Sequence, residues 1–418
     1  MIEYEYLKLG YKPKDDVICL FRIEPSSRLS LKEAATKVAL ESSTGTWVNV
    51  PSREYVKKLN AKIFSIRRNL VKIAYPSALF ERGNAPNILS SIAGNIFGMK
   101  AVNNLRLEDV SFPKSLVKSF PGPYYGIHGV RKILQVYDRP FLGTIIKPKL
   151  GLRTEDHAKS AYESWLGGCD FVKDDENLAS QEFNQFERRI AKTLEMKDRA
   201  EQETGEKKAY LANVTAETCE MLRRAELVRE QGGKFVMIDI VTSGFAAVQS
   251  LREANLKLAI HGHRAMHAAM TRNPKHGIRM IVLADFARLI GVDSLHIGTG
   301  LGKLEGDIKQ VFELAQEVED DRVSETKFRL KQDWYNKKPV LAVCSGGLHP
   351  GHIPFLIRNL GKDIIIQMGG GIHGNELGTG CGAVAARQAI DAALKGISLE
   401  KYAEDKPELK STLKQFEK

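Results

Sequence analysis

Short apolar, β-forming runs alternate with amphipathic segments from about residue 125 onward. Such alternation is typical of repeated strand–helix units built around a parallel sheet. We predict strands at 143–149, 171–173, 210–214, 235–240, 258–263, 294–297, 340–344 and 364–368. Eight strands of this kind indicate an α/β protein with a closed (β/α)8 TIM barrel.

Between the predicted strands, apolar residues recur at helical spacing. Residues 158–165 place Ala, Ala, Tyr and Trp at i, i+3, i+4 and i+7, with Thr154 as the expected N-cap and the glycines at 167–168 as the stop. The same spacing recurs over 311–318, after the sixth strand, and over 386–393, after the eighth. These segments are predicted to be helices that cover the barrel.

The first 120 residues follow a different pattern. A strand is predicted at 17–23, then a helix over 31–38, then further strands and a second helical stretch, which together indicate a separate α+β domain. The Pro-Gly-Pro at 121–123 is a suitable boundary because it resists continuing either a helix or a strand. We therefore predict an N-terminal domain at 1–123, a barrel at 124–400 and a polar, partly disordered tail at 401–418.

Composition narrows the class of protein. Hydrophobic residues make up 43% of the 418 residues and charged residues 27%, close to the average for globular proteins. No apolar run approaches the ~20 residues needed to span a bilayer, and the N-terminal Met-Ile-Glu-Tyr-Glu-Tyr lacks the features of a secretory signal. The five cysteines are scattered and form no C-x-x-C pair, which argues against disulfides and thiolate metal sites. We expect a soluble, cytoplasmic protein without a membrane partner.

The net charge of +11 suits an anionic metabolite, although it could also serve solubility alone. Acidic residues interrupt the lysines and arginines throughout, and no nucleic-acid-binding motif accompanies them. We therefore do not expect a nucleic-acid partner.

Polar residues and glycines stand at nearly every predicted strand end, where a (β/α)8 barrel carries its active site. They are Lys147 and Lys149, then Lys173, Asp175 and Glu176, then His263 and Arg264, then His296, then Ser345, Gly346 and Gly347, then Gly369, Gly370 and Gly371. Any one of them could be a surface ion pair or a turn glycine. Together they predict a catalytic site.

Asp175 and Glu176 supply the hard oxygen ligands that Mg²⁺ prefers. Lys173 fits such a site only if its amine reacts with CO2 to give a carbamate, which would be a third anionic ligand. The alternative is that Lys173 pairs with the two acids as a charged, unreactive ammonium.

Two groups of residues could bind phosphate. The glycine-rich ends of the last two strands expose backbone N–H groups, a usual phosphate site in this fold. Arg264 and His296 could hold a second phosphate, because arginine makes bidentate, charge-assisted contacts. Two phosphate sites around one magnesium site predict a bisphosphate substrate.

Other motifs fail on inspection. Residues 298–303 resemble a P-loop, but the spacing is short and Leu304 replaces the required Ser or Thr, so we predict a flexible loop that presents Lys303. His263 and His267 lack the glutamate of the zinc-protease pattern. His261 and His267 are predicted to be buried structural partners.

Seven longer motifs lie between residues 41 and 347. They are Glu-Ser-Ser-Thr-Gly-Thr-Trp at 41–47, Gly-Asn-Ile-Phe-Gly at 94–98, Gly-Thr-Ile-Ile-Lys-Pro-Lys-Leu-Gly-Leu at 143–152, Gly-Gly-Cys-Asp-Phe-Val-Lys-Asp-Asp-Glu-Asn at 167–177, His-Arg-Ala-Met-His at 263–267, Gly-Lys-Leu-Glu-Gly at 302–306 and Ser-Gly-Gly at 345–347. In order and spacing they resemble the RuBisCO large subunit, in its archaeal form without a small subunit. Two positions depart from the family pattern: Ile145 replaces a threonine, and Asn375-Glu376 replaces a common His-Pro.

The resemblance implies a ferredoxin-like N-terminal domain and a role for each matching residue. Lys173, as its carbamate, would bind Mg²⁺ with Asp175 and Glu176 and act as the base that enolises the substrate. Lys147 would transfer a proton at the substrate carbon, with Lys149 tuning it, and His263 would assist hydration. Lys303 would close over the site and pair with Glu41. The implied substrate-binding residues are Thr46, Trp47, Asn95, Lys149, Arg264, His296, Ser345, Gly346, Gly347, Gln367, Met368, Gly369 and Gly370.

The implied activity is addition of CO2 to ribulose bisphosphate, with Mg²⁺ and an activating CO2 as cofactors and an oxygenase side reaction with O2. Glu41, Thr46, Trp47 and Asn95 would reach the barrel of a neighbouring subunit, so a homodimer with shared sites is expected, possibly assembling further, with no small subunit. Archaeal relatives of this kind suggest a role in AMP or nucleotide salvage.

Two other readings remain open at this stage. A RuBisCO-like enolase or isomerase would keep the barrel and the metal site but lose residues needed for CO2 addition. A non-catalytic module that binds sugar phosphate or nucleic acid would need neither a carbamate nor a mobile lysine. The complete set of Lys147, Lys149, His263, Lys303 and Glu41, together with Asn95, favours the carboxylase.

Overall fold

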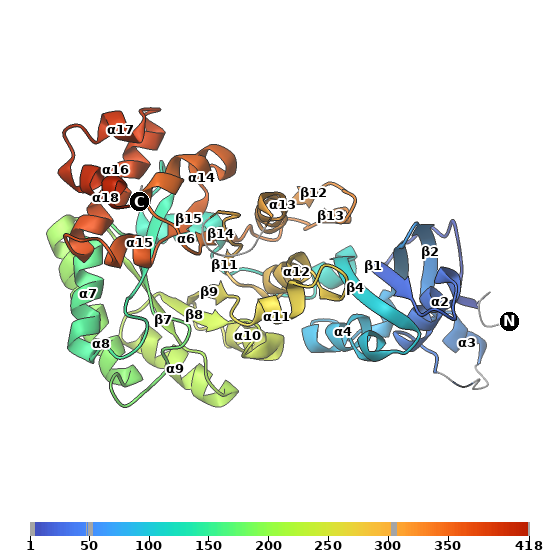
Figure 1. Cartoon of the computed structure of the whole chain (residues 1–418). Helices are drawn as coiled ribbons and strands as arrows, with labels where there is room; N and C mark the ends of the chain where they lie inside the picture. Colours follow the sequence, from blue (N-terminus) through green and yellow to red (C-terminus); the bar gives the residue numbers. More distant parts are fainter. Residues whose placement is uncertain (1–4, 47, 49–52, 302–306, 417–418) are drawn as a thin grey trace. The chain divides into compact units, whose positions relative to one another are not determined.

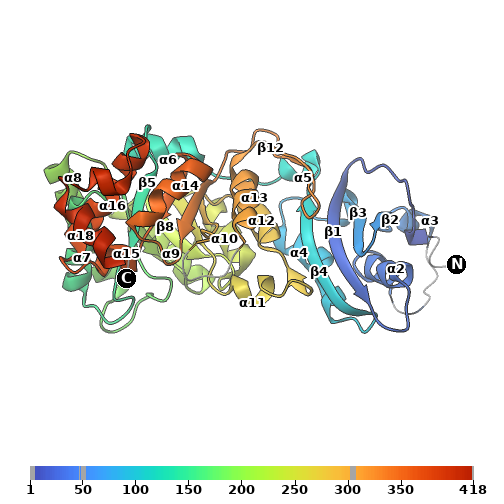
Figure 2. The ribbon, with the colours of Figure 1, turned by 45° about the horizontal axis from the view of Figure 1, so that its top comes forward.

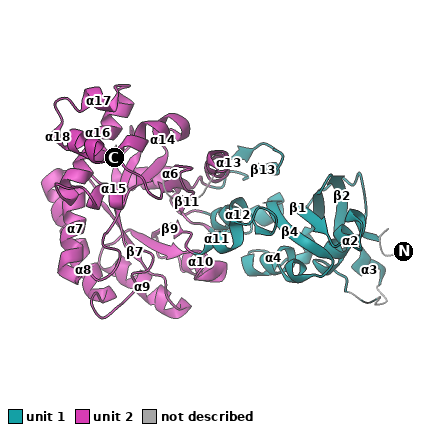
Figure 3. Ribbon diagram, in the orientation of Figure 1, with its two compact units in different colours: residues 1–122, 266–290, 320–337 teal, residues 123–265, 291–319, 338–418 magenta. Residues whose placement is uncertain are grey.

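The computed structural model describes residues 5–46, 48, 53–301 and 307–416. Trp47 and Lys303 lie outside the described residues. The chain forms two compact units, coloured separately in Figure 3: unit 1 comprises 1–122, 266–290 and 320–337, and unit 2 comprises 123–265, 291–319 and 338–418. Because these units are discontinuous in sequence, the linear division into 1–123, 124–400 and 401–418 stays a prediction.

Unit 2 contains a closed barrel of eight parallel strands, in the order β11-β14-β15-β5-β6-β7-β8-β9. The strands are β5 (Phe141–Ile145), β6 (Phe171–Lys173), β7 (Ala209–Asn213), β8 (Phe235–Asp239), β9 (Ala259–His263), β11 (Ser294–His296), β14 (Leu341–Ser345) and β15 (Ile364–Gln367). All eight predicted strands are confirmed. The first was predicted too long, because Pro148 has no N–H to donate to a strand ladder.

Apolar side chains fill the N-terminal end of this barrel. Phe141, Phe171 and Phe235 begin three of the strands, and their rings meet edge to face at centroid distances of 5.3 and 5.5 Å. Helix α6 (Gly126–Leu134) adds Ile127 and other buried residues to the same cluster, so it closes this end of the barrel. The polar residues of the strands are therefore left to the opposite, C-terminal end.

Helices surround the strands, and Figure 1 shows α7, α8 and α9 along the outer edge of the barrel. Besides α6, the helical elements of unit 2 are α7 (Thr154–Leu166), α8 (Phe186–Thr204), α9 (Thr218–Glu230), α10 (Gly244–Glu253), α13 (Ile308–Glu319), η3 (Pro350–His352), α14 (Ile353–Leu360), α15 (Gly370–His373), α16 (Thr379–Leu394), α17 (Leu399–Tyr402) and α18 (Pro407–Phe416). In α7 the N-cap is Arg153, one residue before the predicted Thr154. Thr154 is buried, and its hydroxyl lies 3.2 Å from the Asn184 side-chain oxygen.

The end of the chain holds helices α17 and α18 where we expected a polar, partly disordered tail. Leu409 is fully buried, and its backbone N–H donates to Gln388 of α16 at 3.1 Å. Ser398 caps α17 by accepting from the Lys401 N–H. The buried apolar residues Leu399, Ala403 and Leu409 and local capping thus order a segment whose overall composition is polar.

Unit 1 carries the α+β fold expected for the N-terminal region. Its main elements run β1 (Asp16–Pro25), α2 (Leu31–Glu41), β2 (Lys62–Arg67), β3 (Leu70–Pro76), α4 (Ala85–Ile92) and β4 (Val102–Ser111). The antiparallel pairing β4-β1-β3-β2 gives the ferredoxin-like βαββαβ arrangement. Figure 2 shows α2 beside these strands, and its capping box of Ser30 and Glu33 explains where it begins.

The remaining elements of unit 1 are α3 (Glu54–Lys57), η1 (Ser77–Leu79), η2 (Asn95–Gly98), α5 (Lys114–Val117), α11 (His267–Thr271), β10 (Gly277–Ile278), α12 (Met280–Ile290), β12 (Arg322–Val323) and β13 (Gln332–Asp333). Five of them come from between barrel strands in sequence: α11, β10, α12, β12 and β13. Of these, β10 pairs with β4, and α12 packs against β4. Over the described parts of both units, no helix combines the length and apolarity needed to cross a membrane.

Candidate active site

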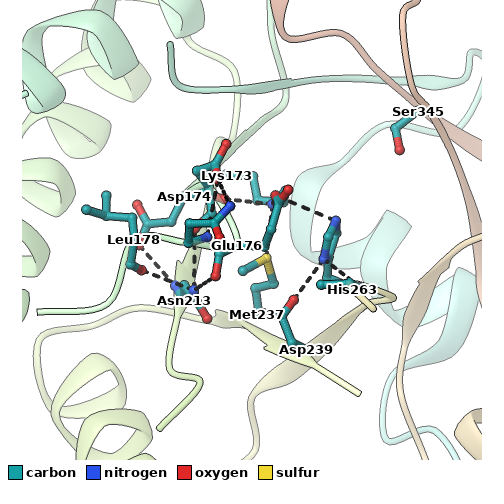
Figure 4. A network of polar contacts seen from close by, with 12 residues as sticks. Lys173, Asp174, Glu176, Leu178, Asn213, Met237, Asp239, His263 and Ser345 are labelled. Atoms are coloured by element: carbon teal, nitrogen blue, oxygen red, sulfur yellow. Dashed lines mark hydrogen bonds and ion pairs between the residues drawn. The ribbon is translucent and has the colours of Figure 1, made fainter. Parts of the chain in front are cut away.

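Lys173 is the last residue of β6, and its side chain is completely buried. Its Nζ donates to the Asp174 carbonyl at 2.7 Å and lies 3.1 Å from Met237 Sδ and 3.5 Å from Glu176 Oε2 (Figure 4). Burial lowers the pKa of Lys173, while the charge of Glu176 opposes that change. A lowered pKa increases the share of neutral amine, the form that reacts with CO2.

Asp175 and Glu176 follow directly in the loop after β6. Asp175 Oδ2 accepts a hydrogen bond from Lys147 Nζ at 2.7 Å, and Glu176 Oε2 lies 3.7 Å from His263 Nε2. Burial raises the pKa of each carboxyl, but neighbouring side chains outweigh it: Lys147 for Asp175, and Lys173 with His263 for Glu176. Both acids are therefore held ionised around the Lys173 amine.

The side chains near Lys173 fit a divalent cation only when Lys173 itself is converted to a carbamate. Among the described residues, no three His, Cys, Asp or Glu side chains gather into a ready cation site. Asp175 and Glu176 provide two oxygen donors, and Lys147 and Lys173 place ammonium groups against them. Converting the Lys173 amine to a carbamate would replace a positive charge by a third anionic oxygen donor, the kind of ligand that Mg²⁺ prefers.

His263 ends β9 and is oriented by Asp239, which ends β8. The Nδ1 atom of His263 lies 2.8 Å from Asp239 Oδ1. A carboxylate beside Nδ1 favours the tautomer that carries its proton there, leaving Nε2 on the side of Glu176 to exchange a proton. The sequence analysis missed Asp239, although its position at the end of a predicted strand was the same signal that identified His263.

Asn213 at the end of β7 is a second residue that the sequence analysis missed. Its Nδ2 donates to the carbonyls of Glu176 and Leu178, both at 3.1 Å, and lies 3.4 Å from that of Asp175. One buried side chain thus holds the backbone of the whole acidic loop, as the dashed lines in Figure 4 show.

Asp174, the third acid of this loop, has a structural role. It is fully buried, and it accepts from Tyr210 Oη at 2.6 Å and from the Asn213 N–H at 3.0 Å. Arg189 Nε and His157 Nε2 lie 3.3 and 3.2 Å from its carboxylate. Burial alone would raise the pKa of Asp174, but Arg189 and His157 lower it by more than burial raises it. The carboxylate therefore stays charged. Asp174 therefore anchors the loop that carries Asp175 and Glu176.

A row of four hydrogen-bonded side chains joins three neighbouring strands, β9, β11 and β14. His296 Nδ1 lies 2.6 Å from Ser345 Oγ, His296 Nε2 lies 2.8 Å from His261 Nε2, and His261 Nδ1 lies 2.8 Å from Ser294 Oγ. Burial lowers the pKa of both histidines well below the ordinary value, so both are neutral. The buried role predicted for His261 is confirmed; His267 is only half-buried, so that prediction is wrong for it.

Arg264 follows β9, and burial lowers the pKa of its guanidinium to about 10. It remains charged at neutral pH. Gly298 makes room for it, because a Cβ at that position would come within 2.5 Å of Arg264 Nη2. The backbone of Gly298 also has a positive φ of 88°, which glycine adopts readily. The arginine predicted to bind phosphate is thus held where a larger residue at 298 would displace it.

The two glycine-rich loops lie at the ends of β14 and β15. Gly346 and Gly347 have positive φ values of 118° and 71°. A Cβ at Gly369 would come within 3.1 Å of Lys147 Cε, so this loop approaches the site lysine closely. Gln367 is 1% exposed, and neither polar atom of its side chain has a hydrogen-bond partner within the described chain. Buried amides are usually paired, so this one is available to a ligand.

The other predicted site residues lie as follows. Lys149 is exposed in the loop after β5, Gly370 begins α15, and the Met368 side chain is buried. Glu41, Thr46 and Asn95 belong to unit 1, at the end of α2, in the loop after it and at the start of η2. The roles of these three, like those of Trp47 and Lys303 outside the described residues, stay predictions.

Comparison with known proteins gives a consistent result over both units. Residues 126–416 match the family described as ribulose bisphosphate carboxylase large chain, catalytic domain, and residues 5–116 match its N-terminal domain. A protein of Methanocaldococcus jannaschii named ribulose bisphosphate carboxylase is 51% identical over 98% of this chain and 99% of its own length. One of the same name from Methanosarcina mazei is 49% identical over 98% of both chains.

Solved structures extend the likeness to the fold. The dimeric archaeal Rubisco of Hyperthermus butylicus is 49% identical, with a TM-score of 0.94 over 99% of both chains. The octameric ribulose-1,5-bisphosphate carboxylase/oxygenase of Pyrococcus horikoshii, in complex with sulfate, is 45% identical, with a TM-score of 0.92 over 99% of this chain and 96% of that one. The chain therefore belongs to the ribulose bisphosphate carboxylase large-chain family.

Proposed function

We propose that this protein is a Mg²⁺-dependent ribulose-1,5-bisphosphate carboxylase, which adds CO2 to the enediolate of its substrate and releases two molecules of 3-phosphoglycerate. The observation that carries the proposal is the buried Lys173 amine at the end of β6, which lies 3.5 Å from Glu176 Oε2 and within the electrostatic influence of Asp175. The names of the full-length relatives agree with it.

Activation begins at Lys173. Its neutral amine attacks CO2, a nitrogen–carbon bond forms, and one proton leaves, giving the carbamate. The carbamate, Asp175 and Glu176 would hold Mg²⁺, which supplies polarisation of substrate oxygens when bound. The fit rests on the donor set: the acids are already ionised, and the amine is buried beside them.

Proton transfers follow from the geometry around the acids. The carbamate of Lys173 takes the proton whose loss enolises the substrate. Lys147, which bonds to Asp175 at 2.7 Å, exchanges a proton at the substrate carbon, with Lys149 tuning it. His263, oriented by Asp239 at 2.8 Å, moves a proton during hydration of the carboxylated product. Lys303 closes over the site, pairs with Glu41 and stabilises the carboxylated transition state.

The two phosphates bind on separate groups. Arg264, His296 and Ser345 take one, because they combine a charged guanidinium with a hydroxyl fixed by the histidine at 2.6 Å. The second binds the backbone N–H groups of the glycine loops, with help from the N-terminal residues of the neighbouring subunit. This second group comprises Thr46, Trp47, Gly347, Gly369 and Gly370, with Asn95, Gly346, Gln367 and Met368 lining the site.

The working unit is a homodimer with shared active sites, possibly assembled further, without a small subunit. The dimeric and octameric relatives support this assembly. The enediolate that attacks CO2 is also open to O2, so an oxygenase side reaction accompanies carboxylation. We place the enzyme in the cytoplasm, in AMP or nucleotide salvage.

The test is anaerobic incubation of the purified protein with Mg²⁺, labelled bicarbonate and ribulose bisphosphate, counting acid-stable label in phosphoglycerate. Lys173→Ala should abolish the label, whereas Lys159→Ala, a change at an exposed lysine of α7, should leave it unchanged. If the folded, dimeric protein yields no label, the carboxylase proposal fails and isomerisation of a phosphorylated ketose becomes the next activity to assay. Phosphoglycolate formed under oxygen reports the side reaction, and its absence would remove that part.

A further inference from the structure

The two glycine-rich loops touch each other. Gly371, in the short helix α15 of the glycine-rich segment after β15, lies close to the loop after β14. An added Cβ would come within 2.2 Å of the Leu348 carbonyl oxygen and 3.0 Å of His349 Cα. A side chain at 371 would separate the loops. Their positions are therefore coupled, and any element that holds one loop also restrains the other.

Helix α18 holds the loop after β15 through paired side chains. Asn375 Nδ2 donates to Thr412 Oγ1 at 2.6 Å, and both residues are buried, at 6% and 0% exposed. The Gln415 side chain donates to the Gly374 carbonyl at 2.7 Å and accepts from the Glu376 N–H at 3.3 Å. One helix thus binds three consecutive residues that begin three positions after Gly371.

The same helix reaches the loop after β14 through its last described residue. The Phe416 ring stacks on His349 at a centroid distance of 4.9 Å and an interplanar angle of 9°. His349 is also held by His352, whose Nδ1 accepts the His349 backbone N–H at 3.3 Å. Because His349 follows Gly347 by two residues, the contact with Phe416 restrains the position of the loop after β14 close to Gly347.

We infer that α18 is a positioning element for substrate binding, with Thr412 and Gln415 as its positioning residues. This inference rests on the proposed function, in which both glycine loops bind one phosphate of the bisphosphate. Backbone N–H groups bind an anion well when they already point at it, because binding then costs little ordering entropy. The Asn375-Glu376 departure from the family pattern gains a physical reason: in this chain Asn375 is the partner of Thr412.

The decisive variants are Thr412→Val, which keeps the shape of the side chain and removes its hydroxyl, and Gln415→Ala. Thr412→Ser restores the hydroxyl and is the rescue variant. Lys410→Ala changes an exposed residue of the same helix and is the matched control. Loss of one such hydrogen bond should raise KM for ribulose bisphosphate ~3- to 10-fold and leave kcat within about twofold. The serine and lysine variants should keep the original KM.

A purely structural helix would behave differently. Thr412→Val would then lower the melting temperature and leave KM unchanged, which would overturn the inference. If Thr412→Val does not fold, Gln415→Ala decides alone, because its side chain is only partly buried.

Binding of inorganic phosphate, measured by calorimetry, separates this inference from the proposed function. If the unaltered protein binds phosphate but does not fix CO2, the function fails. In that case, weaker phosphate binding by Thr412→Val and Gln415→Ala, but not by Lys410→Ala, would still support the role of α18. Equal affinities in all variants, or no phosphate binding by the unaltered protein, would refute it.

Discussion

Phe171 and Lys173 lie two positions apart on β6, so they face the same side of one strand, yet they belong to opposite ends of the barrel. Phe171 packs edge to face with Phe141 and Phe235 in an apolar cluster closed by α6. Lys173 is equally buried but lies among carboxylates, a thioether and a carbonyl. A short strand therefore joins a residue kept for stability to one kept for chemistry, and the two should respond to substitution in opposite ways.

The largest effect is expected from Lys173→Ala. Carboxylation should fall at least ~10³-fold, because the base and a metal ligand are lost together. The melting temperature should change little, because the lowered pKa of Lys173 shows that burial costs its ammonium more than the attraction of Glu176 returns. Carboxylase activity and thermal unfolding, measured on the same preparation, test the two expectations. A variant that unfolds would show that Lys173 is also structural and would break the contrast.

Phe171→Ala should do the reverse. Its free energy of unfolding should fall by about 3–5 kcal/mol, because a buried aromatic ring leaves a cavity. The kcat per folded molecule should stay near its original value. Denaturant unfolding with active-site titration tests this, and Phe355→Ala, a change at a ring that is 38% exposed, is the control expected to matter little. Activity that disappears while the fold survives would contradict it.

Acid should weaken the polar end of the barrel selectively. Burial, with a smaller effect of Lys147, lowers the pKa of His373 from 6.5 to about 4. Between these values the unfolded chain binds a proton that the folded chain excludes. His373 therefore contributes its full stability above pH 6.5 and loses it as pH falls toward 4, by up to about 3 kcal/mol.

Urea unfolding at pH 7.5 and 4.5 measures this effect of His373. His373→Gln should lose less stability over that interval than the unaltered protein. Equal losses in the two proteins would show that other groups account for the acid sensitivity.

A smaller effect is expected at Asn213, which touches the acidic loop but not the reacting atoms. Asn213→Ala removes the donor to the carbonyls of Glu176 and Leu178. Outer residues that orient metal ligands typically change affinity by 10- to 100-fold, so half-activation should require ~10-fold more Mg²⁺. Asn359→Ala, an exposed change on α14, should leave the Mg²⁺ requirement unaltered. An unchanged requirement in Asn213→Ala would limit that residue to folding.

The barrel could be predicted from sequence because each strand is a short apolar run, and the site could be predicted because polar residues end those runs. The same rule should have identified Asp239 and Asn213. Each is a single polar residue without a distinctive neighbour, and its partners, His263 and the carbonyls after Asp175, come from other strands. Such partners become visible only when the strands close into a barrel.

Two other features of the fold could not be predicted from the local pattern of apolar and polar residues. The strand β10 has only two residues and pairs with β4, which is more than 160 positions earlier in the chain. The lysine- and glutamate-rich end of the chain is equally compatible with disorder and with a helix. The order of α18 depends on the burial of Leu409 and Thr412. Two such residues in a polar segment give no clear signal in the sequence.

The row from Ser294 through His261 and His296 to Ser345 has a direction. Each neutral imidazole has one N–H and one bare nitrogen, so the donors in this row must all point the same way. An anion beside Ser345 needs the serine O–H, which obliges His296 Nδ1 to donate to the serine oxygen. His296 Nε2 must then accept from His261, and His261 Nδ1 must accept from Ser294. A phosphate bound at Ser345 would thereby select one of the two proton arrangements of the row. It would fix the tautomer of His261, which lies two strands away.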